Sequence, residues 1–189
     1  ACTDYTIGYD TAMNTAVEMV DKLRDTSQSH DRCSVVEVMG RHAGHIALNT
    51  GIACGATAII IEEMPYNLDD IAKKMLESRK IGKQHFIIVV SEGIGNANGI
   101  AHELQEKTGI EARATILGHV QRGGAPTLRD RVVASQMGYY AVELLEKGVG
   151  NRVVGMQQNK IVDFDIQEAL SMKKTIDKEL YNIADEISF

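Results

Sequence analysis

Short apolar segments alternate along this chain with longer segments in which apolar residues recur at helical spacing. Residues 86–91, Phe-Ile-Ile-Val-Val-Ser, form the unbroken apolar run expected of a strand buried on both faces of a parallel sheet. Met13, Ala16, Val17 and Val20 recur at steps of one, three and four, which is typical of one buried helix face. This alternation predicts an α/β fold of three αβα layers, with a mostly parallel sheet between two layers of helices.

The same pattern places each expected element. We expect strands at residues 33–39, 58–62, 86–91 and 113–117, and helices at residues 10–24, 43–54, 67–80, 98–107 and 127–147. The order changes after residue 148, where a hairpin of residues 152–157 and 160–164 and two short helices at residues 165–171 and 176–186 are expected. Asn67 and Thr127 are suited to begin helices, and Gly82, Gly109 and Gly148 to end them.

Composition excludes several classes of protein. The net charge is -6 and no basic stripe is present, so we expect no nucleic-acid partner. No apolar run approaches the roughly 20 residues that a membrane span needs, so we expect no membrane partner either. Three cysteines without metal or disulfide spacing, Cys2, Cys33 and Cys54, favour a reduced, cytoplasmic location. A first residue Ala1 in place of methionine suggests a processed chain or a fragment.

Three segments follow predicted strands at the carboxyl edge of the sheet, where open α/β sheets bind ligands. They are Met39-Gly40-Arg41, Glu92-Gly93 and the glycine-rich run Gly-His-Val-Gln-Arg-Gly-Gly at residues 118–124. Gly40 would let a ligand approach the backbone near a helix N-terminus, and the side chains of His119 and Arg122 can grip phosphate oxygens.

Two more charged side chains at this edge, those of Glu92 and Arg41, also suit a ligand that carries phosphate. Glu92 can accept hydrogen bonds from sugar hydroxyls, and Arg41 can hold a second phosphate or stabilise charge on one being transferred. The convergence of the three segments therefore predicts a site for a phosphorylated polyol. Each residue also has a plainer interpretation: Gly40 can simply end a strand, Arg122 can be a surface residue, and Glu92 can cap a helix.

A second group of residues lies at the opposite, amino end of the predicted strands: Arg24, Arg32, Gly55, Lys83, His85 and Arg113. Arg32 is separated from Gly40 by roughly 26 Å of extended chain, at about 3.3 Å per residue, so it does not easily reach its own chain's carboxyl edge. These charges either solvate the edge, serve a second site, or reach a neighbouring subunit of a two-fold dimer.

Two other kinds of site are disfavoured. His42 and His45 are spaced like a metal pair on a helix but have no third ligand at suitable spacing, so we expect no metal site. The chain also lacks a G-x-G-x-x-G motif opening a helix after its first strand, which disfavours a dinucleotide-binding dehydrogenase.

Four stretches together resemble bacterial 6-phosphofructokinase: TDYTIGYDTA at residues 3–12, CSVVEVMGR at 33–41, SEG at 91–93 and LGHVQRGGAPTLRDR at 117–131. The resemblance covers essentially the whole chain and corresponds to the carboxyl-terminal part of such an enzyme, a little over half. The long glycine-rich motif is the most specific of the four. The resemblance implies the Rossmann-like fold of the family.

The resemblance also implies a set of binding residues. Fructose 6-phosphate is expected to be held by Met39, Gly40, Arg41, Glu92, His119, Val120, Gln121 and Arg122, with Arg32 and Arg113 reaching in from a neighbouring subunit. An allosteric effector, a nucleoside diphosphate or phosphoenolpyruvate, is expected at Arg24, Gly55, Lys83 and His85. Thr57, Ile81 and Gln84 depart from the acidic and basic residues usual in relatives, which puts regulation by a nucleoside diphosphate in doubt.

The domains and cofactors follow from the same resemblance. Residues 9–120 with 172–189 are expected to form the sugar-phosphate-binding domain, and residues 121–171 to pack on a nucleotide-binding domain. The family's ATP-binding loops, its magnesium-holding aspartate and its catalytic aspartate precede the segment that resembles Thr3. ATP and Mg²⁺ are therefore expected as cofactors of a full-length homotetramer, with no catalytic residue in this fragment and no activity of the fragment alone.

Two alternatives stay open at this point. One is the same portion of a pyrophosphate-dependent phosphofructokinase, because the residues that distinguish the two phosphoryl donors lie in the other part of such enzymes. The other is a non-catalytic regulatory module that only binds a sugar phosphate.

Overall fold

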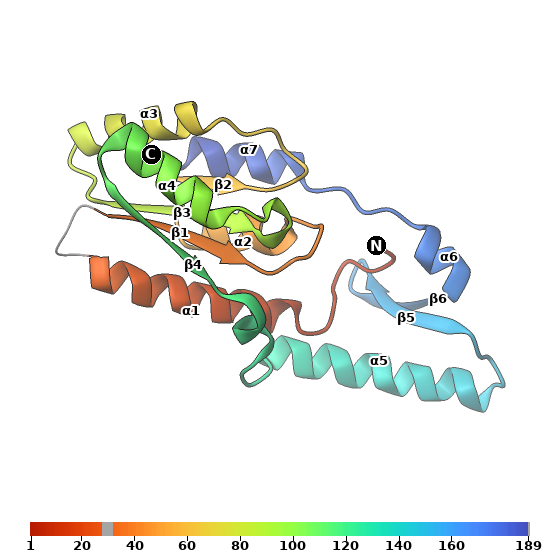
Figure 1. Cartoon of the computed structure of the whole chain (residues 1–189). Helices are drawn as coiled ribbons and strands as arrows, with labels where there is room; N and C mark the ends of the chain where they lie inside the picture. Colours follow the sequence, from red (N-terminus) through yellow and green to blue (C-terminus); the bar gives the residue numbers. More distant parts are fainter. Residues whose placement is uncertain (28–31, 189) are drawn as a thin grey trace. The chain divides into compact units, whose positions relative to one another are not determined.

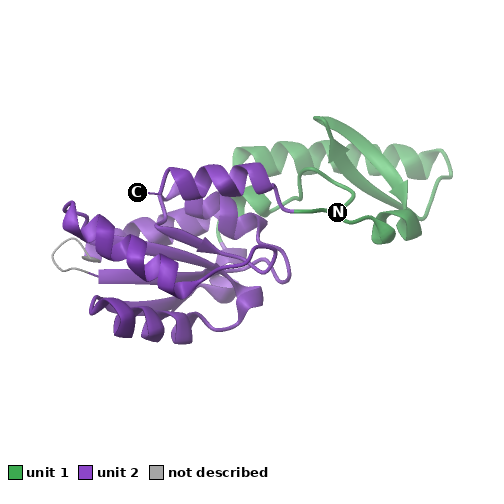
Figure 2. Cartoon of the chain, turned by 90° about the horizontal axis from the view of Figure 1, so that it is seen from above, with its two compact units in different colours: residues 1–11, 124–175 green, residues 12–123, 176–189 purple. Residues whose placement is uncertain are grey.

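The computed structural model describes residues 1–27 and 32–188, which form two compact units. Unit 1 comprises residues 1–11 and 124–175, and unit 2 comprises residues 12–123 and 176–189 (Figure 2). Each unit is assembled from two stretches that are far apart in the sequence.

Unit 2 is built on a four-stranded sheet in the order β2-β3-β1-β4. Its strands are β1 (Arg32–Val38), β2 (Ala58–Ile60), β3 (His85–Ser91) and β4 (Glu111–Ile116). All three neighbouring pairs are parallel, which confirms the predicted sheet. The central strand β3 is buried from Phe86 to Ser91, and this burial on both faces is the reason for its unbroken apolar run.

Helices cover both faces of this sheet, as the alternating pattern predicts (Figure 1). On one face lie α3 (Leu68–Lys80) and α4 (Ala97–Thr108). Met75 from α3 and Leu104 from α4 are fully buried there in a core that also contains Phe86 of β3. The predicted cap of α3 is confirmed, because the Asn67 side chain accepts a hydrogen bond from the backbone N–H of Asp69 at 2.9 Å.

The other face is covered by α1 (Tyr9–Ser27) and α2 (His45–Ala53). Ala16 and Val20 of α1 have no exposed surface. Gly51 of α2 lies so close to Ile59 of β2 that a Cβ on Gly51 would come within 2.5 Å of the isoleucine side chain. Glycine at this position therefore lets α2 approach the sheet closely.

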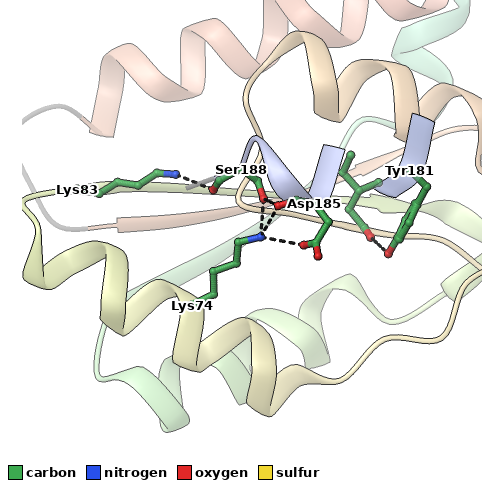
Figure 3. A network of polar contacts seen from close by, with 6 residues as sticks. Lys74, Lys83, Tyr181, Asp185 and Ser188 are labelled. Atoms are coloured by element: carbon green, nitrogen blue, oxygen red, sulfur yellow. Dashed lines mark hydrogen bonds and ion pairs between the residues drawn. The ribbon is translucent and has the colours of Figure 1, made fainter. Parts of the chain in front are cut away.

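The edge strand β2 is covered by the last helix, α7 (Lys178–Glu186). The Tyr181 hydroxyl donates a 3.0 Å hydrogen bond to the backbone carbonyl of Ile59, a contact visible in Figure 3. Helix cover of this kind protects strand edges from pairing with other chains.

Unit 1 contains α5 (Leu128–Glu146), the antiparallel pair β5 (Arg152–Gln157) and β6 (Lys160–Asp165), and the short α6 (Ile166–Ser171). The predicted hairpin is confirmed, and Gln158 and Asn159 form its two-residue turn with positive φ angles of 48° and 61°. Thr127 caps α5, since its hydroxyl accepts from the Asp130 backbone N–H at 3.3 Å.

Asp130, which is 1% exposed, attaches the first residues of the chain to α5 within unit 1. Its carboxylate accepts hydrogen bonds from the backbone N–H groups of Gly8 and Thr11, both at 2.9 Å, and from the hydroxyls of Tyr5 and Thr11. These contacts hold the pKa of Asp130 below its usual value despite burial. Burial of the phenol, together with the hydrogen bond to Asp130 and its negative charge, raises the pKa of Tyr5.

The boundaries of some elements differ from the sequence-based expectation. The expected helix at residues 43–54 begins only at His45, because a tight turn follows β1. The two compact units divide at 123/124 and 175/176, and residues 9–11 group with unit 1. The hydrogen bonds to Asp130 explain this grouping, since they bind residues 8 and 11 to α5. The expected domain division at residues 120/121 and 171/172 stays a prediction.

Candidate functional site

The parallel register brings three loops to one edge of the sheet in unit 2. Val38 at the end of β1 pairs with Ser91 at the end of β3, and Glu37 pairs with Ile116 at the end of β4. The segments that follow these strands, namely residues 39–41, 92–94 and 118–122, are therefore neighbours at the carboxyl edge. Residues 92–94 and 118–122 each form a short 3-10 helix, η1 (Glu92–Ile94) and η2 (Gly118–Arg122).

Glu92 joins the loops after β3 and β1. Its carboxylate oxygen Oε1 accepts hydrogen bonds from the backbone N–H of Gly40 at 3.0 Å and from that of Arg41. Arg41 has a positive φ of 56°, an uncommon conformation for a residue with a side chain. The carboxylate thus stabilises a bent loop. The predicted contact between Glu92 and sugar hydroxyls stays a prediction.

Gly40 has a reason to be glycine that does not involve a ligand. The Ala43 N–H donates to the Gly40 carbonyl at 3.0 Å, and a Cβ on Gly40 would collide with the Ala43 carbonyl oxygen. This turn places Gly40 shortly before Gly44, the N-cap residue of α2, which agrees with a position near a helix N-terminus. The predicted approach of a ligand to Gly40 stays a prediction. The turn leaves the Arg41 side chain exposed beside the loop.

Gln121 lies inside the protein, although its neighbours in η2 are exposed. It is 1% exposed. Its Oε1 accepts from the Met39 backbone N–H at 2.7 Å, and its Nε2 donates to the Ala12 carbonyl at 3.3 Å. Both polar groups of this side chain are therefore engaged with backbone. The predicted contact between Gln121 and substrate stays a prediction.

The remaining predicted residues of this loop point outward. His119, Val120 and Arg122 are all exposed. Residues three apart eclipse one another in a 3-10 helix, so His119 and Arg122 lie on the same side of η2. Two potential donors to phosphate oxygens are thereby placed side by side at the edge of the sheet.

Two further acidic residues at this edge escaped the sequence-based prediction. Glu63 follows β2, and its Oε1 accepts from the Gly44 N–H at 2.7 Å at the start of α2. The pKa of Glu37 is raised, first by burial and then by the nearby negative charge of Glu92. The sequence carries a signal for Glu63, because it follows an apolar strand as Glu92 does.

At the amino end of the sheet, one carboxylate holds both arginines that the resemblance assigns to a neighbouring subunit. Glu111 Oε2 accepts from Arg32 Nε at 3.0 Å, and Glu111 Oε1 accepts from Arg113 Nε at 2.8 Å. These hydrogen bonds lower the pKa of Glu111. Arg32 pairs in register with Glu111 at the first position of β1, so the structure places it at the end opposite to residues 39–41.

The residues predicted to bind an effector also lie toward the amino end, where Figure 3 shows part of their surroundings. Lys83 donates to the Ser188 carbonyl at 3.4 Å, and its pKa is lowered by burial and by the positive charges of Lys74 and Arg24. Arg24 donates to the Cys54 carbonyl, next to Gly55. Binding of an effector by Arg24, Gly55, Lys83 and His85 stays a prediction.

The three residues here that depart from those usual in relatives, Thr57, Ile81 and Gln84, differ in their surroundings. Thr57 has no exposed surface, and its hydroxyl has no hydrogen-bond partner among the described residues. Ile81 is 78% exposed at the end of α3, where a basic side chain would meet solvent. Gln84 contributes its backbone carbonyl, which accepts from the Arg32 N–H at 3.3 Å.

Neither metal ligands nor reactive thiols are apparent among the described residues. Within residues 1–27 and 32–188, no group of three or more histidine, cysteine, aspartate or glutamate side chains is arranged to hold a metal ion. The cysteines Cys2, Cys33 and Cys54 are buried and free. Burial raises the pKa of Cys33 to about 12 and that of Cys54 to about 11, so both stay protonated at neutral pH.

Among residues 1–27 and 32–188, no helix is both long and apolar enough to cross a membrane.

Known proteins share this sequence and this fold. The chain is 55% identical over 188 residues to an ATP-dependent 6-phosphofructokinase of Clostridium botulinum, an alignment that covers 100% of this chain and 59% of the relative. It is also 55% identical to ATP-dependent 6-phosphofructokinase 1 of Clostridium perfringens, over 98% of this chain and 58% of the relative. The chain thus spans a little under three-fifths of the length of these relatives.

A solved structure of phosphofructokinase from Saccharomyces cerevisiae matches with a TM-score of 0.84 and 32% sequence identity, covering 98% of this chain and 25% of that chain. A pyrophosphate-dependent phosphofructokinase from Marinobacter aquaeolei, at 20% identity, shares the fold with a TM-score of 0.75 over 92% of this chain and 49% of that chain. The sequence profile of the phosphofructokinase family matches residues 1–145. This protein chain belongs to the phosphofructokinase family.

Proposed function

We propose that this chain is the part of an ATP-dependent 6-phosphofructokinase that holds fructose 6-phosphate while its 1-hydroxyl accepts a phosphoryl group. The observation that carries the proposal is the meeting of three loops, after β1, β3 and β4, at one edge of the parallel sheet in unit 2. His119 and Arg122 stand together on one side of η2, where both can donate to the 6-phosphate. Arg41 is exposed and can act on the phosphoryl group in transfer.

The other residues of the proposed site shape the loops or contact the sugar. The full set is Met39, Gly40, Arg41, Glu92, His119, Val120, Gln121 and Arg122. Glu92 holds the backbone of the loop after β1, and the lone pairs that this leaves on its carboxylate can accept from sugar hydroxyls. Positioning of this kind supplies much of the catalysis in phosphoryl transfer, which needs little covalent help from the protein.

The phosphoryl donor proposed is ATP, because the two relatives at 55% identity are both ATP-dependent enzymes. ATP supplies the γ-phosphoryl group, and Mg²⁺ neutralises the charge that develops on it. The loops at the carboxyl edge of the sheet in unit 2 are proposed to serve the acceptor side of this transfer. An enzyme made from the complete coding sequence should phosphorylate fructose 6-phosphate with ATP and Mg²⁺, and turnover with pyrophosphate in place of ATP would contradict the assigned donor.

We further propose that unit 2 is the sugar-phosphate-binding part and that α5 of unit 1 packs on a nucleotide-binding part. Five large apolar side chains of α5 are 49% to 80% exposed: Leu128, Val132, Tyr139, Val142 and Leu145. The first four are spaced by four, seven and three residues, which puts them on one side of the helix at about 100° per residue. A contiguous apolar face of this kind usually marks a surface that another element covers.

Arg32 and Arg113 are proposed to serve the site of a neighbouring subunit in a homotetramer. They lie at the amino end of the sheet, away from the loops of their own chain's site. Arg113→Ala should therefore weaken fructose 6-phosphate binding in the assembled oligomer and leave a verified monomer unaffected. A full loss of affinity in the monomer would contradict this assignment.

Calorimetric titration of the purified chain tests the central proposal. Fructose 6-phosphate should bind, and fructose should not, because the phosphate supplies the charge that Arg122 and His119 engage. Equal binding of both sugars, or of neither, would overturn the proposed site. The chain alone should not transfer phosphate from ATP, and measurable turnover would contradict its assignment to the acceptor side.

A further inference from the structure

The buried side chain of Gln121 takes the place of a strand residue beyond the end of β4. β4 ends at Ile116, and the Leu117 N–H still donates to the Glu37 carbonyl of β1 at 3.1 Å. Alternate residues of a strand turn their backbone groups toward the same neighbour, so Met39 N–H faces the side from which β4 has departed. Gln121 Oε1 accepts that N–H at 2.7 Å.

The same carboxamide reaches a third element. Its Nε2 donates at 3.3 Å to the carbonyl of Ala12, which lies in the first turns of α1 and is 7% exposed. One partner is a donor and the other an acceptor, so the site requires one hydrogen-bonding group of each kind at the same place. Gln121 thus connects η2, the carboxyl end of β1 and α1, and the residues that it contacts, Met39 and Ala12, both belong to unit 2.

We propose that Gln121 is a positioning residue. It fixes the position of the loop after β1 relative to η2, which carries His119 and Arg122, and it does not contact the sugar phosphate itself. This inference rests on the proposed function for its ligand, but the hydrogen bonds that carry it do not. Because Gln121 faces inward, its neighbours in the turn, His119 and Arg122, face outward on the side away from the core. Loss of the bridge would free the Met39–Arg41 loop and the turn to move independently.

The first test replaces the side chain by one of similar length without hydrogen-bonding groups. In Gln121→Met, hydrogen exchange at the Met39 amide should accelerate at least about tenfold, because exchange requires that this hydrogen bond open. The dissociation constant for fructose 6-phosphate should rise by about tenfold or more, since misplaced binding groups lose affinity steeply. Unchanged exchange at Met39 would overturn the inference whether or not the wild-type chain binds the sugar phosphate.

A control with the same substitution, at an exposed position, comes from the opposite end of the sheet. Gln105 in α4 also uses its side-chain oxygen to accept from a strand, taking the Ala112 N–H of β4 at 3.0 Å. Gln105→Met removes the same kind of hydrogen bond and should leave both Met39 exchange and the affinity for fructose 6-phosphate unchanged. If wild type and the control bind and Gln121→Met binds equally well despite faster exchange, Gln121 holds the loop without positioning the site, and the proposal is wrong.

A second variant covers the case in which Gln121→Met does not fold. The ionised carboxylate introduced by Gln121→Glu can accept from Met39 but cannot donate to Ala12, whereas the protonated acid can do both. The affinity of Gln121→Glu relative to wild type, measured at each pH, should therefore be low at pH 8 and recover toward wild type at about pH 5. A ratio that does not change with pH would overturn the role of the bridge. Absence of binding by wild type would instead refute the proposed function and leave the exchange result to decide on Gln121.

Discussion

At the carboxyl end of the sheet in unit 2, Glu92 faces two backbone N–H groups, whereas at the amino end Glu111 faces two guanidinium groups. Glu92 is half-buried and decides the shape of a loop. Glu111 forms partly exposed ion pairs that water and salt screen, with 70% of the Arg113 side chain and 31% of the Arg32 side chain exposed. The carboxyl end is therefore organised by backbone hydrogen bonds, and the amino end by partly exposed side-chain charges.

The difference suggests different tasks for the two ends. A rigid loop set by backbone contacts can hold a ligand of defined shape, because little entropy remains to be lost when the ligand binds. Arginines that form partly exposed ion pairs with one glutamate can exchange that partner for another anion at small cost. This fits the proposed division between a substrate site at one end and residues lent to a neighbour at the other.

The largest effect is expected at the carboxyl end on removal of a side chain that is proposed to contact the ligand. Arg122→Ala should weaken binding of fructose 6-phosphate by about 2 kcal/mol or more, the value of a charge-assisted contact. Calorimetry on the chain measures this. Arg79→Ala, a change of an exposed arginine in the last turn of α3, serves as the control and should leave the affinity unchanged. Equal losses in the two variants would mean that only general charge attracts the ligand.

A smaller effect is expected when the loop loses its charged acceptor. Glu92→Gln keeps an oxygen for Gly40 and Arg41 but removes the charge, and should lower the free energy of unfolding by about 1 kcal/mol per charge-assisted bond weakened. Urea denaturation measures the change, and faster hydrogen exchange at Gly40 and Arg41 should accompany it. Glu103→Gln removes an exposed helical ion pair with Lys107 at 3.4 Å and should change stability far less.

The third effect should appear as a pH dependence. The pKa of Glu37 is raised in the folded chain by burial and by Glu92, so the folded state binds more protons than the unfolded state above the ordinary value of 4.5. Stability should therefore fall as pH rises from 4.5 toward the raised pKa. Glu37→Gln should remove this part of the slope in unfolding free energy measured against pH. An unchanged slope would show that Glu37 does not carry this charge effect.

The smallest effect is expected at the amino end. Arg32 and Arg113 lower the pKa of Glu111, so its ion pairs stabilise the fold above the ordinary value of 4.5 and lose that contribution as pH falls. Glu111→Gln should cause a slight loss of stability at pH 7 that disappears at low pH and in high salt. A loss as large as that of Glu92→Gln would remove the contrast between the two ends.

Local sequence pattern was sufficient to predict the helices and strands and the edge of the sheet where the three candidate loops meet. Each expected strand and helix is present, with ends that shift by a few residues, because burial periodicity and helix caps such as Asn67 and Thr127 are local properties. Parallel strands have their carboxyl ends at one edge, so residues 39–41, 92 and 118–122 could be predicted to meet without knowing the order of strands.

The tertiary structure decided what each polar group at that edge contacts. Glu92 engages the backbone of the loop after β1, Gln121 turns inward to Met39 and Ala12, and Asp130 draws residues 8 and 11 into unit 1. Such partnerships depend on which strands are neighbours, here β3 and β4 on either side of β1, and on which backbone groups are left unpaired where strands end. Hydrogen bonds between segments so far apart along the chain leave no periodic trace in the sequence, since their geometry exists only after the chain has packed.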